Sequence, residues 1–218
     1  MPAHNSELVL TSTLTALAAR LRGSGAEVIV VENGSTDDTW ALLQVSREKW
    51  SAEGVSLVVV ASERGLGNAL RAGTAASTGD FVLWTADDLP FGFSDLDAWL
   101  RLDAAPLVAV GSKGHPASSV NRALQRRVLT RLFTLARRLV LDMRTRDPQG
   151  TVFLGGDWAR CLASGLRETG YLITTEAVLA GELAGLHPVE IPVTLSASAG
   201  DHPTRVRVTD IADMAAGL

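Results

Sequence analysis

The chain has 218 residues, of which 46% are hydrophobic and 20% are charged, so it is long and apolar enough to fold around a substantial core. The formal net charge of −4 and the pI near 5.6 argue against nucleic acid as a partner. The one cysteine, Cys161, excludes an internal disulfide, and no cysteine–histidine cluster suggests zinc. Cys161 stands among apolar neighbours, and we predict that it lies in the core.

No stretch of the sequence reaches the roughly 18 consecutive apolar residues that a membrane-spanning helix needs. The first residues, MPAHNSE, lack the basic and apolar regions of a signal peptide. We therefore expect a cytoplasmic protein in a reducing compartment.

The first hundred residues alternate apolar, β-branched runs with segments of helical periodicity. The first expected helix begins at Ser6 and ends at Gly23 and Gly25. Strands are expected at residues 26–31, 55–61 and 81–84, with helices after the loops at residues 32–39 and 65–68. Connections of this kind build a parallel sheet with helices on both faces. The loops that follow the strands then gather along one edge of the sheet, where α/β proteins bind their ligands.

The second half contains a strongly basic segment after an expected strand at residues 106–111. Nine of the chain's twenty Lys and Arg residues lie between Lys113 and Arg146, against one acidic residue, Asp142. Apolar residues recur in this segment every three or four positions. We therefore predict a long basic helix or helix pair over residues 118–146.

The remaining elements are shorter. Residues 151–154 return to the sheet, a helix begins at Asp157, and another covers residues 174–184. We expect an edge strand at residues 189–195, because Pro192 has no N–H to donate to a ladder. A mobile loop over residues 196–204, a short strand with Arg205 and a terminal helix complete the prediction.

The sequence FVLWTADDLP, residues 81–90, places two adjacent carboxylates directly after a buried strand. Asp87 and Asp88 repel each other unless a cation joins them, and Mg²⁺ binds through one or two carboxylates together with substrate phosphates. The alternative is that both aspartates are turn and cap residues before a helix. The expected convergence of strand ends at this edge of the sheet favours the metal site.

Two further loops follow strands. In ENGSTDDT, residues 32–39, the carboxylate of Glu32 can accept hydrogen bonds from a base or ribose, and the helix N-terminus favours an anion. A well-capped turn explains the same string. In RGLGNALRAG, residues 64–73, the glycines allow close approach of a ligand, but the string matches neither G-x-G-x-x-G nor the P-loop.

These motifs, with PAHNSE near the start and DPQGTVFL at residues 147–154, resemble in order and spacing the family-2 glycosyltransferases of the GT-A fold. The dolichol- or polyprenyl-phosphate mannose (or glucose) synthases are the subgroup that the motifs resemble, over roughly residues 1–195. The resemblance implies one α/β domain over residues 1–218, with a nucleotide-sugar half (1–105) and an acceptor half (106–218). It also implies inverting transfer of a sugar from a GDP- or UDP-linked donor, with Mg²⁺ or Mn²⁺ as cofactor.

The resemblance also implies roles for single residues. Asp87 and Asp88 fall on the metal motif D-x-D, and Glu32 takes the place of the base-recognising aspartate. Arg122 and Arg126 are implied contacts of the acceptor phosphate and the pyrophosphate. The implied catalytic residues are Asp88, Arg122 and Asp147. The implied nucleotide-sugar-binding residues are Pro2, Ala3, Glu7, Glu32, Ser35, Asp37, Arg64, Gly67, Asp87, Arg126, Gln149 and Arg205.

The chain departs from the family pattern in three places. The expected D-A-D is replaced by Thr85-Ala86-Asp87-Asp88, which changes the number or position of the carboxylates. The first strand is almost absent, as if the chain began upstream of Met1. Leu66 stands where the family's G-K-G has lysine.

The acceptor is predicted from the basic segment and the resemblance together. An apolar stripe flanked by arginines, between Ser119 and Met143, suits a peripheral contact with anionic lipid at the inner face of the membrane, and a polyprenyl phosphate as acceptor. The same arginines also fit a solvated helix face. A phosphate nucleophile is already ionised, whereas a hydroxyl acceptor would need a base, for which Glu176 and Asp147 are candidates.

Two other functions remain open at this point. One is a glycosyltransferase with a soluble acceptor. The other is a nucleotide-sugar-binding protein that has lost catalysis through its altered metal motif. A sugar nucleotidyltransferase would need a Gly-rich basic loop near the N-terminus, which this sequence lacks.

Overall fold

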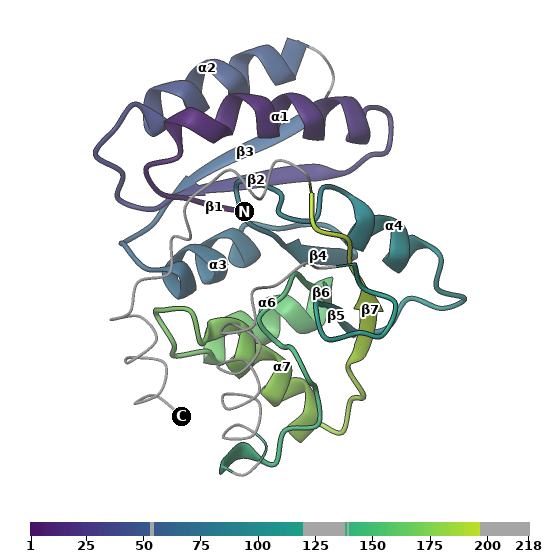
Figure 1. Ribbon diagram of the computed structural model, residues 1–218. Helices are drawn as coiled ribbons and strands as arrows, with labels where there is room; N and C mark the ends of the chain where they lie inside the picture. Colours follow the sequence, from purple (N-terminus) through teal and green to yellow (C-terminus); the bar gives the residue numbers. More distant parts are fainter. Residues whose placement is uncertain (53–54, 120–137, 139, 197–218) are drawn as a thin grey trace. The chain divides into compact units, whose positions relative to one another are not determined.

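The computed structural model, drawn in Figure 1, describes residues 1–52, 55–119, 138 and 140–196. Its chain divides into two compact units. The first unit comprises Met1–Leu89 and Gly155–Thr169, and the second comprises Pro90–Leu154 and Gly170–Leu218. The chain therefore passes between the compact units after Leu89, Leu154 and Thr169. The functional division into a nucleotide half (1–105) and an acceptor half (106–218) stays a prediction.

The first unit contains a parallel sheet in the order β1-β2-β3. Pro2 of β1 pairs with Val31 of β2, and Glu27 of β2 pairs with Ser56 of β3. The strands of this unit are β1 (Pro2–Ala3), β2 (Glu27–Glu32), β3 (Ser56–Ala61) and β4 (Phe81–Trp84). The expected strands at residues 26–31, 55–61 and 81–84 are thus confirmed to within one residue. The first strand is short, as the sequence predicts.

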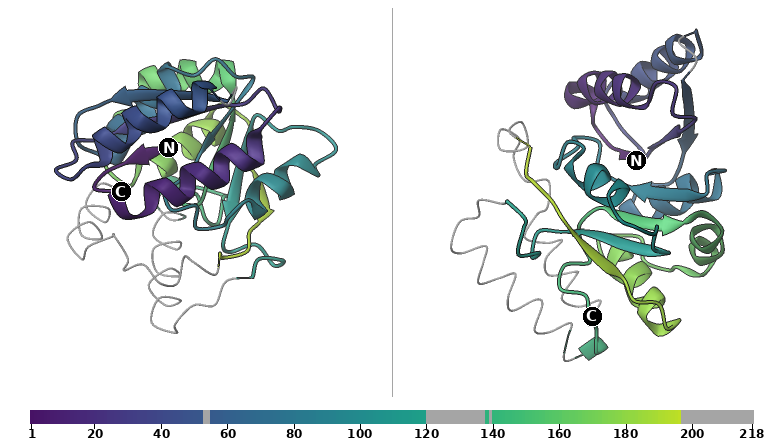
Figure 2. Two further views of the ribbon diagram at one scale, coloured as in Figure 1. Left: turned by 90° about the horizontal axis from the view of Figure 1, so that it is seen from above. Right: turned by 90° about the vertical axis from the view of Figure 1, so that its right-hand side faces the viewer.

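Helices cover both faces of the β1–β3 sheet. α1 (Glu7–Leu21) and α2 (Thr39–Ala52) lie on one face and α3 (Leu66–Ala75) on the other, as Figure 1 and Figure 2 show. α6 (Gly156–Gly165) packs against α3. The buried residues follow the helical and β-branched patterns of the sequence and include Leu10, Leu14, Val30, Val31, Leu43 and Ala69. The prediction of an α/β fold with helices on both faces of a parallel sheet is confirmed.

The second unit is built on β5 (Val108–Ser112), whose residues are all buried. β5 pairs antiparallel with β6 (Val152–Gly155) and parallel with β7 (Val189–Pro192). Pro192 lies opposite Ser112, and β7 is the end strand among those that the structure describes, as its proline predicts. Among the described residues, this unit contains the helices α4 (Ser94–Leu100) and α7 (Ile173–Leu183).

The structure corrects three predictions. α4 was not expected, because a seven-residue helix is too short for a clear periodic signal. The predicted helix over 118–146 is wrong at both ends: Ser119 forms an isolated bridge with Thr194, and Asp142, with φ of 50°, begins a non-helical stretch. Residues 120–137 and 139 of that helix lie outside the described residues, as does the segment from residue 197 onward.

Cys161 is exposed, so its placement in the core was wrong. It lies on α6 two residues from each of the buried residues Ala159 and Ala163. A displacement of two residues turns a side chain by about 200° around a helix, because one turn takes 3.6 residues. The apolar composition around Cys161 could not reveal which face it occupies.

The carboxyl group of Asp95 is buried in the second unit, at 3% exposure in the first turn of α4. Burial raises the pKa of Asp95, although the N–H of Leu96 and the neighbouring Thr151 hydroxyl oppose that shift. The folded chain therefore keeps this proton at pH values where the unfolded chain has lost it. The resulting stability is present below the unfolded pKa of about 3.8 and is lost as the pH rises through the folded pKa.

Replacing Asp95 by Asn removes this ionisation while it keeps an oxygen for the Leu96 N–H. We expect the free energy of unfolding of the wild type, relative to Asp95→Asn, to fall as the pH rises above the unfolded pKa of about 3.8. Denaturant titrations at several pH values measure it, with the exposed Asp103→Asn as control. A wild type that gains stability over Asp95→Asn across this range would contradict the assignment.

Candidate nucleotide site

The carboxyl ends of β1, β2 and β3 bring three loops together in the first unit. Ala3 pairs with Glu32, and Glu32 pairs with Ala61, so the residues that follow all three strands start at the same level of the sheet. Hydrogen bonds then join the loops: the N–H of Asn5 donates to Ser35 Oγ at 3.1 Å and the N–H of Thr36 donates to Asn5 Oδ1 at 2.8 Å. The predicted residues Pro2, Ala3, Glu7, Glu32, Ser35, Asp37 and Arg64 all belong to this region or its immediate flanks.

Glu32 ends β2 with a half-buried side chain whose Oε1 accepts the N–H of Ser35 at 2.5 Å. This contact turns the carboxylate toward the loop that precedes α2. The predicted residues Glu32 and Ser35 are therefore in direct contact. An N–H or O–H group of a base or ribose that binds to Glu32 would therefore share its carboxylate with the N–H of Ser35.

Asp37 acts as a cap in the structure. Its Oδ1 accepts the N–H and the hydroxyl of Thr39, at 3.1 and 2.6 Å, and its Oδ2 accepts the N–H of Glu7 at 3.2 Å. Burial opposes its ionisation, but these hydrogen bonds together lower the pKa of Asp37. The capped-turn interpretation thus accounts for Asp37, which fixes the starts of α1 and α2 relative to each other.

The glycine-rich string at the start of α3 is covered by the chain's own backbone. The N–H of Gly67 donates to the carbonyl of Thr169 at 2.8 Å. A Cβ at Gly67 would lie 1.9 Å from the carbonyl oxygen of Glu168. The guanidinium of Arg71 donates to the same Glu168 oxygen at 2.7 Å. The close approach that the sequence predicts at Gly67 therefore occurs, and residues 168–169 make it. A nucleotide contact of Gly67 stays a prediction.

The two aspartates of the metal motif occupy different environments. Asp87 is 4% exposed, and its carboxylate accepts a short hydrogen bond from the hydroxyl of Ser6, the residue before α1. Thr13 of α1 also donates to the carbonyl oxygen of Asp87 at 2.6 Å. Burial lowers the pKa of the nearby Met1 amino group to about 5, and the charge of Asp87 opposes that shift. Asp88, by contrast, is half-buried.

These surroundings fit a metal that a substrate brings, and they do not form a metal cage. No group of three or more His, Cys, Asp or Glu side chains suited to an ion occurs among the described residues. Mg²⁺ sites with one or two carboxylates plus substrate phosphates need no more protein donors than Asp87 and Asp88 provide. Of the two, Asp88 has the greater solvent access.

The predicted residues of the second unit are placed only in part. Asp147 is half-buried, and its Oδ2 accepts the N–H of Lys113 at 3.0 Å, which joins the loop after β5 to the segment before β6. Gln149 is half-buried in the same segment. Arg122, Arg126 and Arg205 lie outside the described residues, so their predicted phosphate contacts stay predictions.

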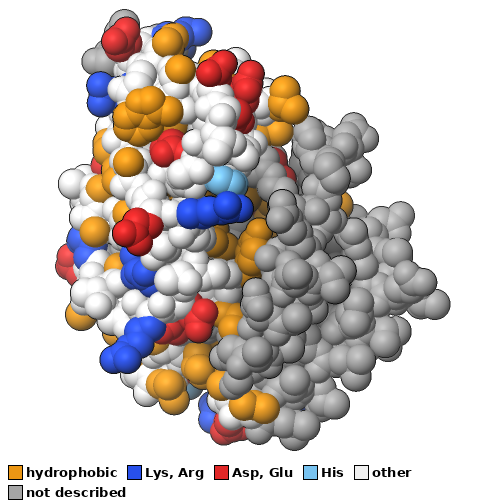
Figure 3. Space-filling model, turned by 90° about the vertical axis from the view of Figure 1, so that its left-hand side faces the viewer, with side chains coloured by type: hydrophobic (Ala, Val, Ile, Leu, Met, Phe, Trp, Pro, Cys, Tyr) orange, Lys and Arg blue, Asp and Glu red, His pale blue; other side chains and the backbone are white. Residues whose placement is uncertain are grey.

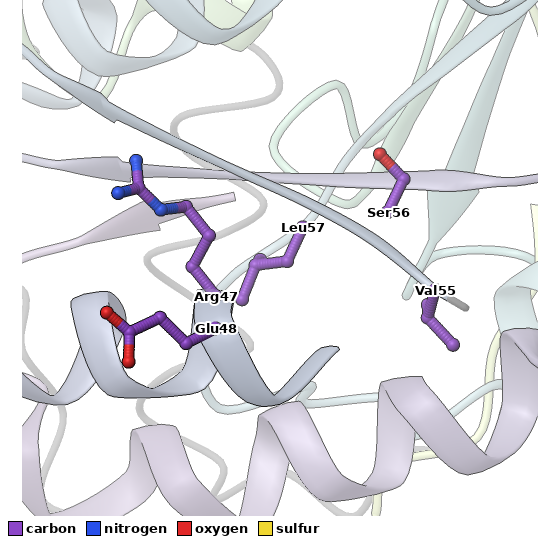
Figure 4. A pocket seen from close by; sticks show the side chains of 5 residues that line it. All are labelled: Arg47, Glu48, Val55, Ser56 and Leu57. Carbon is purple, nitrogen blue, oxygen red and sulfur yellow. The ribbon is translucent and has the colours of Figure 1, made fainter. Parts of the chain in front are cut away.

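The hollow that Figure 4 shows does not belong to this site. It has a volume of about 580 Å³ and is lined by Arg47 and Glu48 of α2 and by residues 55–57 at the start of β3. The predicted residues instead follow the other ends of the strands. On the face in Figure 3, acidic and basic side chains are interspersed among the described residues. The described residues on that face therefore form no broad basic field that would attract a phosphate.

Several residues that shape the site were not predicted. The buried contacts of Ser6, Thr13, Asn33, Arg71 and Glu168 join segments up to 97 residues apart. Asn33 stands inside the ENGS string, and its position directly after a strand was the one available signal. Ser6 and Arg71 likewise stand inside the PAHNSE and RGLGNALRAG strings, whereas Thr13 and Glu168 carry no local pattern.

Comparison with known proteins relates these loops to sugar transfer. The sequence model of the family described as glycosyl transferase family 2 matches residues 1–155. Among curated proteins, the human dolichyl-phosphate beta-glucosyltransferase is 29% identical over 132 residues, which cover 53% of this chain and 40% of that protein. Its Saccharomyces cerevisiae counterpart is 30% identical over 123 residues, covering 50% and 36%. The chain thus spans less than half the length of these curated relatives.

Solved structures show a similar fold over almost the whole chain. The glucosyl-3-phosphoglycerate synthase of Mycobacterium tuberculosis, in complex with UDP, has a TM-score of 0.66 at 21% identity. The alignment covers 99% of this chain and 74% of that one. The same enzyme with Mn²⁺, UDP-glucose and glycerol 3-phosphate has a TM-score of 0.65 at 21% identity, with the same coverage.

The contact at Gly67 predicts a specific sensitivity to a methyl group. Gly67→Ala would push Cβ into the 168–169 backbone, so we expect the free energy of unfolding to fall by about 1–3 kcal/mol. Gly165→Ala is the matched control, because a Cβ at Gly165 meets nothing within 4 Å. Denaturant titration of both variants measures the difference. Equal stability of the two variants would show that residues 168–169 do not press on Gly67.

Proposed function

The chain belongs to glycosyl transferase family 2 and has the GT-A fold, and we propose that it moves a sugar from a nucleoside diphosphate sugar to an acceptor with inversion at the anomeric carbon. The observation that carries this proposal is the convergence of three loops at the carboxyl ends of β1, β2 and β3, which hydrogen bonds of Asn5 and Asn33 join to one another. Glu32, Ser35 and Arg64 lie in these loops. Ligands of α/β proteins bind at such an edge.

The donor is proposed to lie over these loops. Glu32 accepts hydrogen bonds from the base or ribose, and the guanidinium of Arg64 stabilises the negative diphosphate. The enzyme of similar structure in complex with UDP supports a uridine donor. A GDP-linked sugar is the other donor that the sequence predicts.

A divalent cation, Mg²⁺ or Mn²⁺, is proposed to bind with the diphosphate at Asp88, with Asp87 beside it. When bound, such a cation neutralises the charge that develops on the leaving diphosphate. Asp87, held by Ser6 and Thr13, keeps the loop that carries Asp88 in place. The Mn²⁺ in the similar enzyme supports a metal at this site.

The acceptor that we favour is a polyprenyl phosphate. The curated relatives are dolichyl-phosphate glucosyltransferases, which supports a lipid-linked phosphate. A phosphate oxygen is already ionised at neutral pH, so its attack on the anomeric carbon requires no general base. Arg122, Arg126 and Arg205 are proposed to bind the charges on the acceptor phosphate and the departing diphosphate. Asp147, which accepts the Lys113 N–H, is proposed to shape the loop after β5.

A soluble phosphorylated acceptor is the second candidate. It is favoured by the fold likeness to a glucosyl-3-phosphoglycerate synthase, which covers 99% of this chain. With such an acceptor a hydroxyl attacks, and a carboxylate such as Glu176 or Asp147 would have to take its proton. A binding protein without catalysis is the third candidate, and the altered metal motif is the feature that favours it.

Contact with a membrane remains part of the proposal for the lipid acceptor. No helix among the described residues is long and apolar enough to cross a bilayer. Peripheral binding between Ser119 and Met143, at the inner face of the membrane in a cytoplasmic protein, is the arrangement that we propose. Most of that segment lies outside the described residues.

A transfer assay tests the function directly. The full chain is incubated with Mn²⁺, UDP-glucose or GDP-mannose, and either polyprenyl phosphate in anionic vesicles or 3-phosphoglycerate. We expect a lipid-linked sugar from one donor and release of its nucleoside diphosphate. Product on 3-phosphoglycerate alone would select the soluble acceptor. Binding of the donor without any product would favour the binding protein.

The two aspartates should respond differently to amidation. We expect Asp88→Asn to lose most of the Mn²⁺-dependent stabilisation by UDP or GDP. Asp87→Asn weakens the buried bond from Ser6 and should cost about 1–3 kcal/mol of stability without ligand. A thermal-shift panel with each nucleotide, with and without Mn²⁺, measures both effects. An unchanged Mn²⁺ effect in Asp88→Asn would contradict its assignment.

A further inference from the structure

We propose that Asn33 is a positioning residue that locks the three loops of the nucleotide site into one arrangement before the donor binds. This inference rests on the proposed function, because it assigns to Asn33 a role in presenting Glu32 and Arg64 to a nucleoside diphosphate sugar. Asn33 itself is 4% exposed and follows β2 directly. It is therefore buried beneath the site and acts through its neighbours.

The side-chain amide of Asn33 holds the loop that follows β3. Its Nδ2 donates to Gly65 O at 2.8 Å and lies 3.1 Å from both Ser62 Oγ and Glu63 O. Its Oδ1 accepts the N–H of Gly65 at 2.8 Å. Both polar atoms of the amide are thus engaged, and Gly65 is held through its N–H and its carbonyl at once.

These hydrogen bonds stabilise an unusual backbone conformation, because Gly65 has a φ of 133°, which other residues rarely adopt. Arg64 directly precedes it and is exposed. Fixing Gly65 therefore fixes the main chain from which the Arg64 side chain extends. A Cβ at Gly34 would lie 3.6 Å from Arg64 Cβ, so the loop after β2 also packs against Arg64.

The main chain of Asn33 binds the third loop. Its N–H donates to the carbonyl of Ala3 at 3.0 Å, and its carbonyl lies 2.9 Å from Nδ1 of His4. One residue thereby joins the segments after β1, β2 and β3. The main-chain contacts with Ala3 and His4 do not involve the side chain of Asn33, whereas the bonds to residues 62–65 depend on its amide.

Preorganised loops bind more tightly because the ordering cost is met before the ligand arrives. Without the amide, three oxygen atoms and one N–H group of residues 62–65 lose their contact with Asn33. The entropy cost of ordering this segment then falls on the binding step and weakens the affinity for the ligand. We expect Asn33→Ala and Asn33→Asp to weaken nucleotide binding. Asp can still accept the Gly65 N–H, but it places a carboxylate against the oxygens of Ser62, Glu63 and Gly65.

The test compares nucleotide binding and kinetics in matched variants. In the full chain, Kd for UDP and GDP with Mn²⁺ is measured by calorimetry, and KM and kcat are measured for the donor that turns over. We expect Asn33→Ala and Asn33→Asp to raise Kd and KM about tenfold or more, with kcat changed by less than about threefold. Thr74→Val is the control, since Thr74 is also buried and hydrogen-bonded, to Trp84 in the same unit.

The outcomes separate a positioning role from a structural one. If Asn33→Ala and Thr74→Val both lower the melting temperature but leave Kd and KM unchanged, the inference is overturned. Should Asn33→Ala fail to fold, Asn33→Asp, which keeps the volume of the side chain, carries the comparison. Hydrogen exchange of the 62–67 segment without ligand adds a second measurement, and unaltered protection in Asn33→Asp would also overturn the inference. A wild type that binds no nucleoside diphosphate would overturn the proposed function itself.

Discussion

The parallel pairing of β1, β2 and β3 is the constraint on which the first unit depends. Parallel strands present their carboxyl ends at one edge, so the polar residues after each strand must share that edge. Unpaired main-chain groups in the loops then need partners, and Asn5, Asn33 and Asp37 supply them. The candidate site is therefore a consequence of how the loops satisfy their own hydrogen bonds.

This arrangement divides the motif residues into two kinds. Residues of the first kind have partners inside the protein that explain why they stand at their positions. Asp37 caps the starts of α1 and α2, and Asp87 accepts a hydrogen bond from Ser6. Gly67 packs closely against residues 168–169. Glu32 and Asp88 are half-buried and Arg64 is exposed, whereas Asp87 and Gly67 are buried. Glu32, Arg64 and Asp88 are the residues proposed to contact a ligand, and the internal contacts of Asp37, Asp87 and Gly67 hold the surrounding loops in place.

The sequence predicted the strands well because buried parallel strands are short, continuous apolar runs with abrupt polar ends. The sequence-based prediction failed for features that local sequence patterns do not reveal. α4 is too short to show a period, the turn at Asp142 interrupts an apolar pattern that continues to Met143, and Cys161 lies on the outer face of α6. Each of these features is decided by tertiary packing.

The same limit applied to the site. The adjacency of Asp87 and Asp88 suggested that both bind a metal, but it could not reveal that Ser6, 81 residues away, is bonded to Asp87. Asn33 looked like part of a turn, and its partners lie up to 32 residues further along the chain. Local pattern thus located the edge of the sheet correctly. It could not assign roles among the residues that gather there.

The most direct test of this account is a crystal structure of the full chain with Mn²⁺ and the nucleoside diphosphate that stabilises it. The account predicts the nucleotide across the loops after β1, β2 and β3, with the metal bound by Asp88 and the diphosphate oxygens at about 2.0–2.2 Å. A nucleotide bound elsewhere on the chain, or a metal with no contact to either Asp87 or Asp88, would contradict it.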